Sequence, residues 1–410
     1  MIGALLAPLV LAATVSAGSS TASLDGRVMV GYQGWFACEG DGSALGWRHW
    51  SVNPRQSPSA KNIQFDLWPD VSEFPASSRY VTGLKLADGR PAELYTSANA
   101  AVVDRHFEWM REHGIDGVFL QRYPCELAEP ALRQQRDAVL GFVRASASRT
   151  GRSFAVMYDL TGLKAGEVGR VGDDWLALQA KLGLDCDGAY QREAGRPLVA
   201  IWGVGFADDR AYALSECRDL VVRLKSEGCA IMLGVPSWWR EGKRDALADP
   251  MLREIAMLAD VISPWSVGRY RTPDGAVAHA ETVWRGDAAW CREHSIRLLP
   301  VVFPGFSWHN LHGGPLDEIP RLGGKFLWSQ FVGARRVGAT SAYVAMFDEV
   351  NEGTAIFKCA AEVPTGNGLQ FLSREKVPSD HYLRVTGLGG KLLRGENADE
   401  SFPLALPLVR

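Results

Sequence analysis

The amino-acid sequence predicts an α/β protein, a (β/α)8 TIM barrel with a long first βα loop and a short C-terminal extension. Eight short apolar runs alternate with stretches of helical spacing, as in a parallel sheet that closes into a barrel. The chain has 410 residues, and a single barrel with insertions can exceed ~400 residues. The first turn after a strand, Gly31-Tyr-Gln-Gly-Trp35, lacks the three-glycine phosphate cradle of an open doubly wound sheet. The closed barrel is therefore the preferred prediction.

Each predicted strand is a short run of β-branched or apolar residues. The eight runs are Val28–Tyr32, Gly117–Gln121, Phe154–Tyr158, Leu198–Trp202, Ala230–Gly234, Val261–Ser263, Leu298–Phe303 and Ala342–Met346. Apolar residues with helical spacing lie between them, as at Val103, Phe107 and Met110. Gly114 and Gly151 each follow such a stretch, at the position where glycine commonly ends a helix.

We assign the barrel to residues 24–360. Its first βα connection, from about Gln33 to Ala98, is rich in Trp, Asp, Ser and Pro, and loops of this length are usually functional. Residues 361–410 contain no convincing barrel unit. We expect them to form a C-terminal extension that packs on the outside of the barrel and is mobile from about Gly387 onward.

Residues 1–17 are typical of a secretory signal peptide. Leu5 to Val15 is an apolar run, and Val15-Ser-Ala17 fits a small-residue cleavage site. The run is shorter than the ~20 residues that cross a bilayer as a helix, and no other segment qualifies as a membrane span. We therefore expect a secreted or periplasmic protein without a membrane span.

Composition and motifs argue against several classes of function. The formal net charge is −3 and no basic block occurs, so we expect no nucleic-acid partner. The sequence has no CxxC pair, no G-x-S-x-G elbow and no P-loop, so we expect no cofactor. The 14 Trp residues favour a carbohydrate partner, because indole faces stack on pyranose rings. Cys38 and Cys125, each just after a predicted strand, are the pair we would test for a disulfide.

Candidate substrate-binding residues follow the predicted strands, because the active site of a barrel lies at the carboxyl ends of its strands. Aromatic rings, amides and carboxylates at these positions suit a polyhydroxylated substrate. The candidates are Tyr32, Trp35, His49, Trp50, Gln121, Tyr123, Tyr158, Asp159, Trp202, Trp265, Trp308, Asp348 and Asn351.

The carboxylates after the last strand are the candidate catalytic groups. Glycoside hydrolysis needs one carboxyl group to protonate the departing oxygen and a second to act at the anomeric side. Glu349 and Glu352 are three residues apart, a spacing that can place two side chains ~5–6 Å apart on one side of a turn. Such proximity raises one pKa, so an acid and a base coexist near neutral pH. In the alternative interpretation, Asp348 or Asn351 caps a following helix whose solvated first turn carries the glutamates.

The segment from Phe347 to Thr354 resembles the strand-eight motif of the glycoside hydrolase family 99 endo-α-mannosidases and of related family 71/99-like proteins, which carry an N-E-W-H-E-G-T type sequence. Gly31-Tyr-Gln-Gly-Trp35 and Gly46-Trp-Arg-His-Trp50 are similar to the opening strand and the following H-W loop of that group. The resemblance covers roughly Val28 to Phe357 and rests on short motifs.

This resemblance implies a retaining glycoside hydrolase that acts on a glycan or polysaccharide. Glu349 matches the glutamate that deprotonates the 2-hydroxyl of the sugar, and Glu352 matches the general acid and base at the glycosidic oxygen. The same match makes Tyr32, His49 and Tyr158 candidate contacts of the cleaved sugar, and Trp35 or Trp50 candidate stacking platforms.

The chain departs from the family pattern within the motif. Val350-Asn351 replaces an aromatic residue and His, and Asp348 replaces Asn, which adds a third carboxylate beside the pair. The departure motivates an alternative function, a catalytically degenerate barrel that binds glycans. A second alternative, a metal-dependent hydrolase, is motivated by His309 and His312, although two glycines follow them and argue against the helix of a usual His pair. We expect no metal site.

Overall fold

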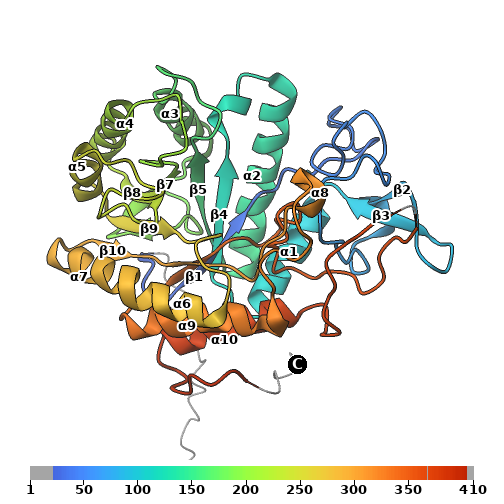
Figure 1. Ribbon diagram of the computed structural model, residues 1–410. Helices are drawn as coiled ribbons and strands as arrows, with labels where there is room; N and C mark the ends of the chain where they lie inside the picture. Colours follow the sequence, from blue (N-terminus) through green and yellow to red (C-terminus); the bar gives the residue numbers. More distant parts are fainter. Residues whose placement is uncertain (1–21, 367, 404–410) are drawn as a thin grey trace, which may run out of the picture.

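The computed structural model describes residues 22–366 and 368–403, so the predicted signal peptide at residues 1–17 lies outside the described residues. The chain folds into a barrel of parallel strands surrounded by helices (Figure 1). The barrel strands are β1 (Val28–Tyr32), β4 (Gly117–Arg122), β5 (Ser153–Asp159), β7 (Arg196–Trp202), β8 (Ala230–Pro236), β9 (Val261–Trp265), β10 (Arg297–Leu298), β11 (Val301–Val302) and β12 (Ala342–Val344). Every predicted strand is confirmed, with shifts of a few residues at the ends.

The seventh strand is broken into two short pieces, β10 and β11. β10 pairs with β9, whereas β11 pairs with β12, which in turn pairs with β1. Between the pieces, the Leu299 N–H donates to the Ile262 carbonyl at 2.8 Å, and the Tyr343 N–H donates to the Pro300 carbonyl at 3.0 Å. Proline has no N–H to continue the ladder, which explains the interruption. These hydrogen bonds close the barrel.

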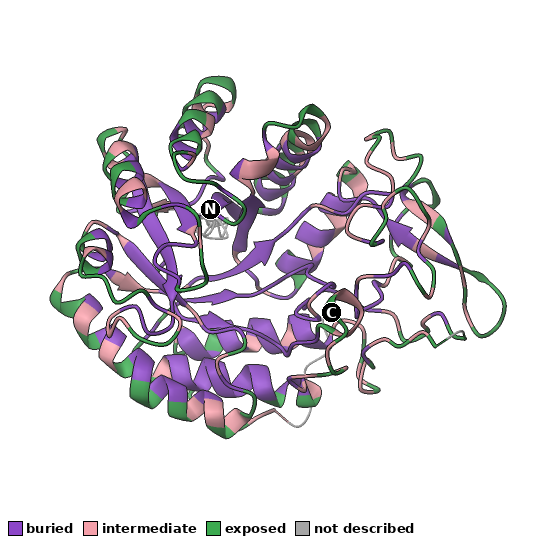
Figure 2. Ribbon diagram, turned by 45° about the horizontal axis from the view of Figure 1, so that its top comes forward, coloured by how far each residue is buried: buried purple, intermediate pink, exposed green. Residues whose placement is uncertain are grey.

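Helices cover the outside of the barrel, and their outward faces are exposed while the strands are buried (Figure 2). They are α1 (Ala100–Glu112), α2 (Pro130–Thr150), α3 (Arg170–Leu182), α4 (Leu214–Ser226), α5 (Met251–Met257), α6 (Pro273–His279), α7 (Arg285–Glu293), α8 (His309–His312), α9 (Lys325–Arg336) and α10 (His381–Leu393). Shorter elements are the helical turns Ala76–Ser78, Pro124–Glu126, Ala280–Trp284 and Leu322–Gly324, and β6 (Arg192–Glu193), which pairs with β7.

The predicted helix signals agree with the observed ends. Asn99 caps α1, because its side chain accepts the Ala101 N–H at 3.0 Å. Gly114 follows α1 with a φ of 69°, and Gly151 ends α2 with a φ of 66°. Both values lie in the left-handed region that glycine adopts at low cost, so these residues end their helices as expected.

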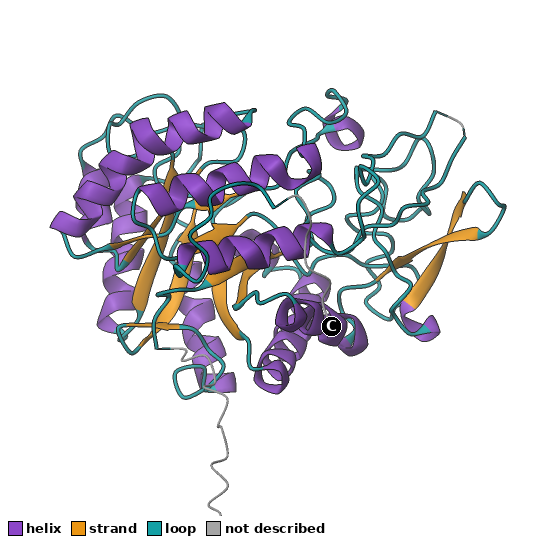
Figure 3. Cartoon of the chain, turned by 90° about the horizontal axis from the view of Figure 1, so that it is seen from below, coloured by secondary structure: helices purple, strands orange, loops and turns teal. Residues whose placement is uncertain are grey.

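The first βα connection extends sideways from the barrel (Figure 3). It carries an antiparallel hairpin of β2 (Arg79–Lys85) and β3 (Pro91–Tyr95). Segment 358–360 adds to this part of the fold, because the Asp70 N–H donates to the Lys358 carbonyl and the Ala360 N–H donates to the Trp68 carbonyl, both at 2.9 Å. The long loop is therefore an ordered structure attached to the segment that follows strand eight.

The C-terminal segment contains α10, which packs against α9 and β1 in the position of the eighth barrel helix. We expected mobility from Gly387 onward, and this expectation is wrong for the part of α10 that follows Gly387, whereas residues 404–410 lie outside the described residues. A Cβ at Gly387 would lie 1.9 Å from the His113 carbonyl oxygen, and one at Gly389 would lie 2.4 Å from the Phe331 ring. The glycines allow α10 to approach its neighbours closely.

All seven cysteines lie in the described residues and are free thiols. The Cys38 thiol donates to the Tyr95 carbonyl at 3.1 Å, and the Cys125 thiol donates to the Thr161 carbonyl at 3.2 Å. Our candidate disulfide is therefore wrong, because the two side chains contact different loops. None of the helices within residues 22–366 and 368–403 has the length and apolar character that crossing a bilayer requires.

Candidate active site

The turn after β12 presents the two candidate catalytic glutamates at the carboxyl end of the barrel. The Thr354 N–H donates to the Glu349 carbonyl at 3.1 Å, and the Ser307 N–H donates to the Glu352 carbonyl at 2.9 Å. These bonds fold residues 349–354 into a compact turn joined to the loop after β11. The next helix along the chain is α10, which begins at His381. The alternative interpretation, with the glutamates in the first turn of a helix, is therefore wrong.

Glu349 is held by hydrogen bonds at both carboxylate oxygens. Oε1 accepts the backbone N–H groups of Asn351 at 2.8 Å and Glu352 at 3.4 Å, while Oε2 accepts the Gln33 side-chain amide at 3.1 Å. Its side chain is 2% exposed. Burial and the charges of Glu352 and Asp348 raise the pKa of Glu349 well above its usual range, and the two backbone donors oppose this rise.

Glu352 is partly buried. Burial raises the pKa of Glu352 to about 7, which a hydrogen bond from Trp308 opposes and the charge of Asp159 supports. The two glutamates titrate as a coupled pair, because each ionised carboxylate disfavours ionisation of the other. The site can therefore hold one proton near neutral pH, as an acid–base pair requires.

Two cavities meet at the glutamates. The barrel cavity, of about 320 Å³, lies over the strand ends. Its lining residues are Gln33, Trp35, Gln121, Tyr123, Asp159, Thr161, Trp202, Trp265, Tyr343, Met346, Glu349 and Glu352. The loop cavity, of about 390 Å³, lies beneath the first βα connection. Its lining residues are Trp35, Arg48, His49, Ser51, Val52, Pro54, Gln64, Leu311, Glu349, Asn351 and Glu352. Trp35 and both glutamates line both cavities, which together form one cleft.

Most of the predicted binding residues line this cleft. The barrel cavity contains Trp35, Gln121, Tyr123, Asp159, Trp202 and Trp265, and the loop cavity contains His49 and Asn351. Trp308 is 38% exposed and hydrogen-bonds to Glu352. Trp202 and Trp265 contact each other edge to face with ring centroids 5.2 Å apart. The barrel cavity therefore has aromatic walls and carboxylates at its centre.

Besides Trp308, which lines neither cavity, four predicted binding residues lie outside the cleft, and their prediction as substrate contacts is wrong. The Tyr32 hydroxyl bonds to His106 Nδ1 at 2.8 Å, and the Tyr158 hydroxyl donates to Asp174 on α3 at 2.8 Å. Successive side chains of a strand point to opposite faces, so these tyrosines face the helices while Gln33 and Asp159 face the cleft.

The other two are Trp50 and Asp348. Trp50 is 0% exposed, stacks on Phe36 at 4.1 Å and donates its indole N–H to the Tyr95 carbonyl. Asp348 is also 0% exposed, and its two oxygens accept the N–H groups of Gln33 at 2.7 Å and Gly34 at 2.9 Å. Burial raises the pKa of Asp348 to about 6, and these backbone donors oppose the rise. Asp348 thus joins the ends of β1 and β12.

Several cleft residues were not among the predicted site residues. Gln33, Tyr343 and Met346 line the barrel cavity, and alternation along the predicted strands could have indicated Gln33. Gly31 makes room for the other two, because a Cβ there would lie 2.2 Å from Met346 Cε and 2.6 Å from the Tyr343 hydroxyl. The loop residues Arg48, Gln64 and Leu311 carry no periodic signal that would have indicated them.

His49 and Asn351 connect the first loop to the strand-eight turn. Asn351 Nδ2 donates to the carbonyls of His49 at 2.7 Å and Gln64 at 2.8 Å. His49 adopts a φ of 64°, and its ring stacks on Trp35 at 3.9 Å. Burial, together with the charges of Arg136 and Arg48, holds the pKa of His49 well below its usual value, so the imidazole is neutral. The departure from the family motif at Asn351 thus has a structural role in this chain.

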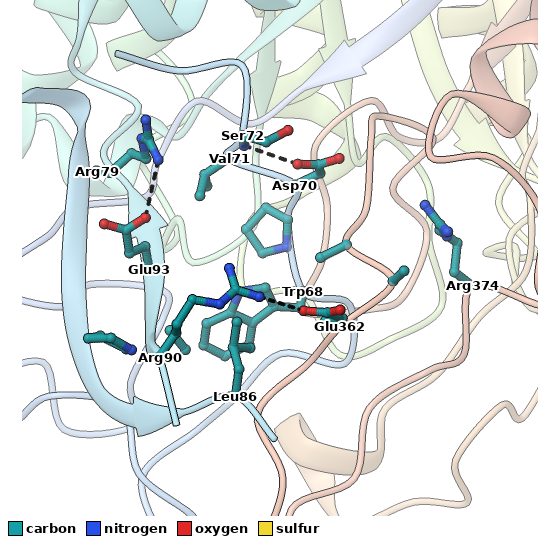
Figure 4. Close-up of a pocket in the computed structure, with 15 residues that line it drawn as sticks. Trp68, Asp70, Val71, Ser72, Arg79, Leu86, Arg90, Glu93, Glu362 and Arg374 are labelled. Atoms are coloured by element: carbon teal, nitrogen blue, oxygen red, sulfur yellow. Dashed lines mark hydrogen bonds and ion pairs between the residues drawn. The ribbon is translucent and has the colours of Figure 1, made fainter. Parts of the chain in front are cut away.

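A further cavity, of about 390 Å³, lies outside the barrel between the β2–β3 hairpin and segment 360–374 (Figure 4). The acidic side chains of this cavity contact residues that do not line the cleft. Glu93 pairs with Arg79 at 3.5 Å, and Glu362 pairs with Arg90 at 2.8 Å. Asp70, the third acidic residue of this cavity, accepts the Ser72 N–H at 3.0 Å. Each acidic side chain here thus has its own partner, apart from the cleft.

His309 and His312 lie on α8, a one-turn helix that Gly313 ends with a φ of 73°. We expected no helix there, and the glycine instead terminates a very short one. His309 Nδ1 lies 2.9 Å from the Gly314 carbonyl of its own loop. Across the part of the chain that the structure describes, no group of three or more His, Cys, Asp or Glu residues could hold a metal ion.

No protein-family model matches the chain, and the comparison with curated proteins found no match. Among solved structures, the GH99 endo-α-mannosidase from Bacteroides thetaiotaomicron superposes with a TM-score of 0.66 at 15% identity, over 92% of this chain and 100% of that chain. The same enzyme in complex with bis-tris propane gives 0.66 at 16% identity, over 91% and 99%. A structure described as a glycoside hydrolase-like protein gives 0.52 at 14% identity, over 83% and 98%. The chain therefore has the glycoside-hydrolase-like (β/α)8 fold seen in the GH99 endo-α-mannosidase.

Proposed function

We propose that the protein is a glycoside hydrolase that cleaves a glycan or polysaccharide with retention of anomeric configuration. The observation that carries this proposal is the pair Glu349 and Glu352 at the junction of two cavities in an aromatic cleft. Their pKa values are raised, so one member is protonated near neutral pH. A protonated carboxyl beside an ionised one is what glycosidic cleavage needs. The fold shared with an endo-α-mannosidase adds support.

The hydrogen bonds of Glu349 and Glu352 indicate which of the two is the acid and which is the base. Glu349 accepts three N–H groups, which stabilise a carboxylate, whereas the Glu352 side chain has the single hydrogen bond from Trp308. Burial also raises the pKa of Glu349, but these three donors favour its ionised form. We therefore assign the shared proton to Glu352, which acts as general acid toward the departing oxygen and then as base toward water. Glu349 remains ionised and acts as the base toward the 2-hydroxyl of the sugar.

This assignment agrees with the mechanism that the motif resemblance implies, in which the sugar's own 2-hydroxyl oxygen displaces the leaving group. That oxygen bonds to the anomeric carbon as its proton passes to Glu349, and the glycosidic bond breaks as Glu352 gives up its proton. Water then attacks the anomeric carbon as Glu352 accepts its proton, the bond between that carbon and the 2-oxygen breaks, and Glu349 returns its proton to restore the 2-hydroxyl. Two inversions leave the configuration unchanged.

A panel of purified glycans, assayed with wild type and with Glu352→Gln, tests the proposal. We expect wild type to release reducing ends from at least one glycan, and Glu352→Gln to lose ~10²–10⁴-fold in turnover while still binding that glycan. A matched control is Glu362→Gln, because this carboxylate lies in the cavity outside the barrel. If Glu352→Gln and wild type release the same amount from every glycan, the proposal is wrong.

The second candidate, a barrel that binds glycans without cleaving them, is motivated by Asn351 in place of the family's His. The contacts of Asn351 weaken this motive, because its side chain anchors the first loop while both glutamates remain in the cleft. Binding of a glycan by wild type, with no product after prolonged incubation, would favour this candidate over the hydrolase.

A further inference from the structure

We propose that Gln33 is a positioning residue that fixes the Glu349 carboxylate and favours its ionised form, and that the Tyr123 hydroxyl holds the Gln33 amide in place. This inference rests on the proposed function, because it assigns the means by which Glu349 is held as the base. No feature of the motif resemblance includes Gln33 in such a role. Four hydrogen bonds link the ends of β1, β4 and β12.

The main chain at Gln33 has a fixed position. Its N–H donates to Asp348 Oδ1 at 2.7 Å, and the next N–H, of Gly34, donates to Asp348 Oδ2 at 2.9 Å. Because Asp348 directly precedes Glu349, the Gln33 side chain begins at a set distance from the catalytic turn. Gln33 is 7% exposed, so surrounding atoms limit its rotamers.

The amide group of Gln33 makes one hydrogen bond through its nitrogen and one through its oxygen. Nε2 donates to Glu349 Oε2 at 3.1 Å, and Oε1 accepts the Tyr123 hydroxyl at 3.1 Å. An ionised carboxylate can only accept, so it faces the NH₂ end of the amide. The amide oxygen of Gln33 then faces Tyr123, whose hydroxyl donates to it. Turning the amide over would point its oxygen at the carboxylate and lose the bond to Glu349, whereas the Tyr123 hydroxyl can donate or accept and holds the amide in place.

The consequence concerns the second oxygen of Glu349. The turn itself holds Oε1 through the N–H groups of Asn351 and Glu352, and this hold does not depend on Gln33. Oε2 depends on Gln33 for its protein donor. Loss of that donor therefore leaves the carboxylate free to rotate about the Oε1 anchor, and it removes a bond that favours the ionised form.

The test compares the pH dependence of kcat/KM in wild type, Gln33→Leu and Tyr123→Phe, on a glycan that wild type cleaves. Gln33→Leu keeps the approximate shape and removes the donor. We expect its acidic limb to move up by about one to two pH units, because a charge-assisted hydrogen bond to the ionised base is lost. Tyr123→Phe keeps the donor but removes the hydroxyl that holds the amide in place, so its limb should move in the same direction by a smaller amount.

A merely structural role for Gln33 would lower activity equally at every pH. Scaled profiles of Gln33→Leu and wild type that coincide would therefore overturn the proposal. If Gln33→Leu fails to fold, Tyr123→Phe alone decides, since it removes one hydroxyl, and an unmoved acidic limb in it would overturn the proposal.

A second arm needs no turnover and so separates this inference from the proposed function. In the Glu352→Gln background, Glu349 titrates without its coupled partner, and ¹³C NMR of labelled glutamate side chains follows its ionisation. Adding Gln33→Leu should raise the Glu349 pKa by about one to two units. An unchanged titration would overturn the inference even if wild type is an active glycosidase. A raised pKa in a protein that cleaves no glycan would support the positioning role and refute the hydrolase.

Discussion

Replacing Glu352 by Gln should stabilise the protein at alkaline pH, although it removes a catalytic group. Burial raises the pKa of Glu352 from 4.5 to about 7. The folded protein therefore binds this proton more tightly than the unfolded chain does. The resulting stability is fully present below about pH 4.5 and is lost as the pH rises to about 7. Above pH 7 the folded state carries a buried charge that the neutral amide of Gln does not have.

The size of the effect follows from the shift. A difference of about 2.5 pKa units corresponds to about 3 kcal/mol of unfolding free energy. An unfolding entropy of about 2.1 cal/mol/K per residue gives about 0.9 kcal/mol/K for the whole chain, so the expected gain in Tm is about 3–4 °C.

The assay is thermal unfolding of wild type and Glu352→Gln at pH 4.5 and pH 8. We expect equal Tm values at pH 4.5 and a higher Tm for Glu352→Gln at pH 8. Glu362→Gln is the control, because the Glu362 side chain is 70% exposed and an exposed ion pair contributes little. A Tm difference between wild type and Glu352→Gln that is the same at both pH values would refute the reasoning, since it would mean that burial does not perturb Glu352.

Three other predictions follow from the same geometry. The activity of wild type should fall as the pH rises through about 7, where Glu352 loses the proton that it donates; a kcat/KM profile that rises from pH 7 to 9 would contradict this. Asp348→Ala should lower the unfolding free energy by about 2–5 kcal/mol, because two buried N–H groups lose their acceptor, whereas Asp348→Asn keeps an acceptor oxygen and should cost less in urea denaturation. Gly387→Ala should destabilise the protein by about 1–3 kcal/mol, since its Cβ would clash with the His113 carbonyl. The control Gly141→Ala, with open space around its Cβ in α2, should instead stabilise the protein by about 0.5–1 kcal/mol. Equal Tm changes for the two variants would show that the clash is absent.

The strands were predictable because parallel barrel strands are buried on both faces and appear in the sequence as short, nearly continuous apolar runs. The break in the seventh strand was also accessible, since Pro300 cannot donate to a ladder. α10 was not. Its glycines Gly387, Gly389 and Gly390 lower helix propensity by about 1 kcal/mol each, and only the packing against His113 and Phe331 explains them.

The site was predictable in its centre and less so in its walls. Glu349 and Glu352 are close in sequence, so a single turn brings them together. Tyr32 and Tyr158 were predicted as substrate contacts, but in each case the next residue along the chain faces the cleft. The sequence does not show which face of a strand points into the barrel, because the barrel and its helices set the phase of side-chain alternation. The loop cavity is lined by residues as far apart in the sequence as Gln64 and Leu311. No local sequence pattern connects these residues.

The most direct test of the catalytic pair is the dependence of cleavage on the leaving group. A leaving group of low pKa departs without a proton, so it makes general acid catalysis unnecessary. On an aryl glycoside with such a leaving group, built on a sugar that wild type accepts, Glu352→Gln should form and release product at a rate much closer to wild type than on the natural glycan. Glu349→Gln should be impaired on both substrates. Equal losses of Glu352→Gln on both substrates would contradict its assignment as the acid.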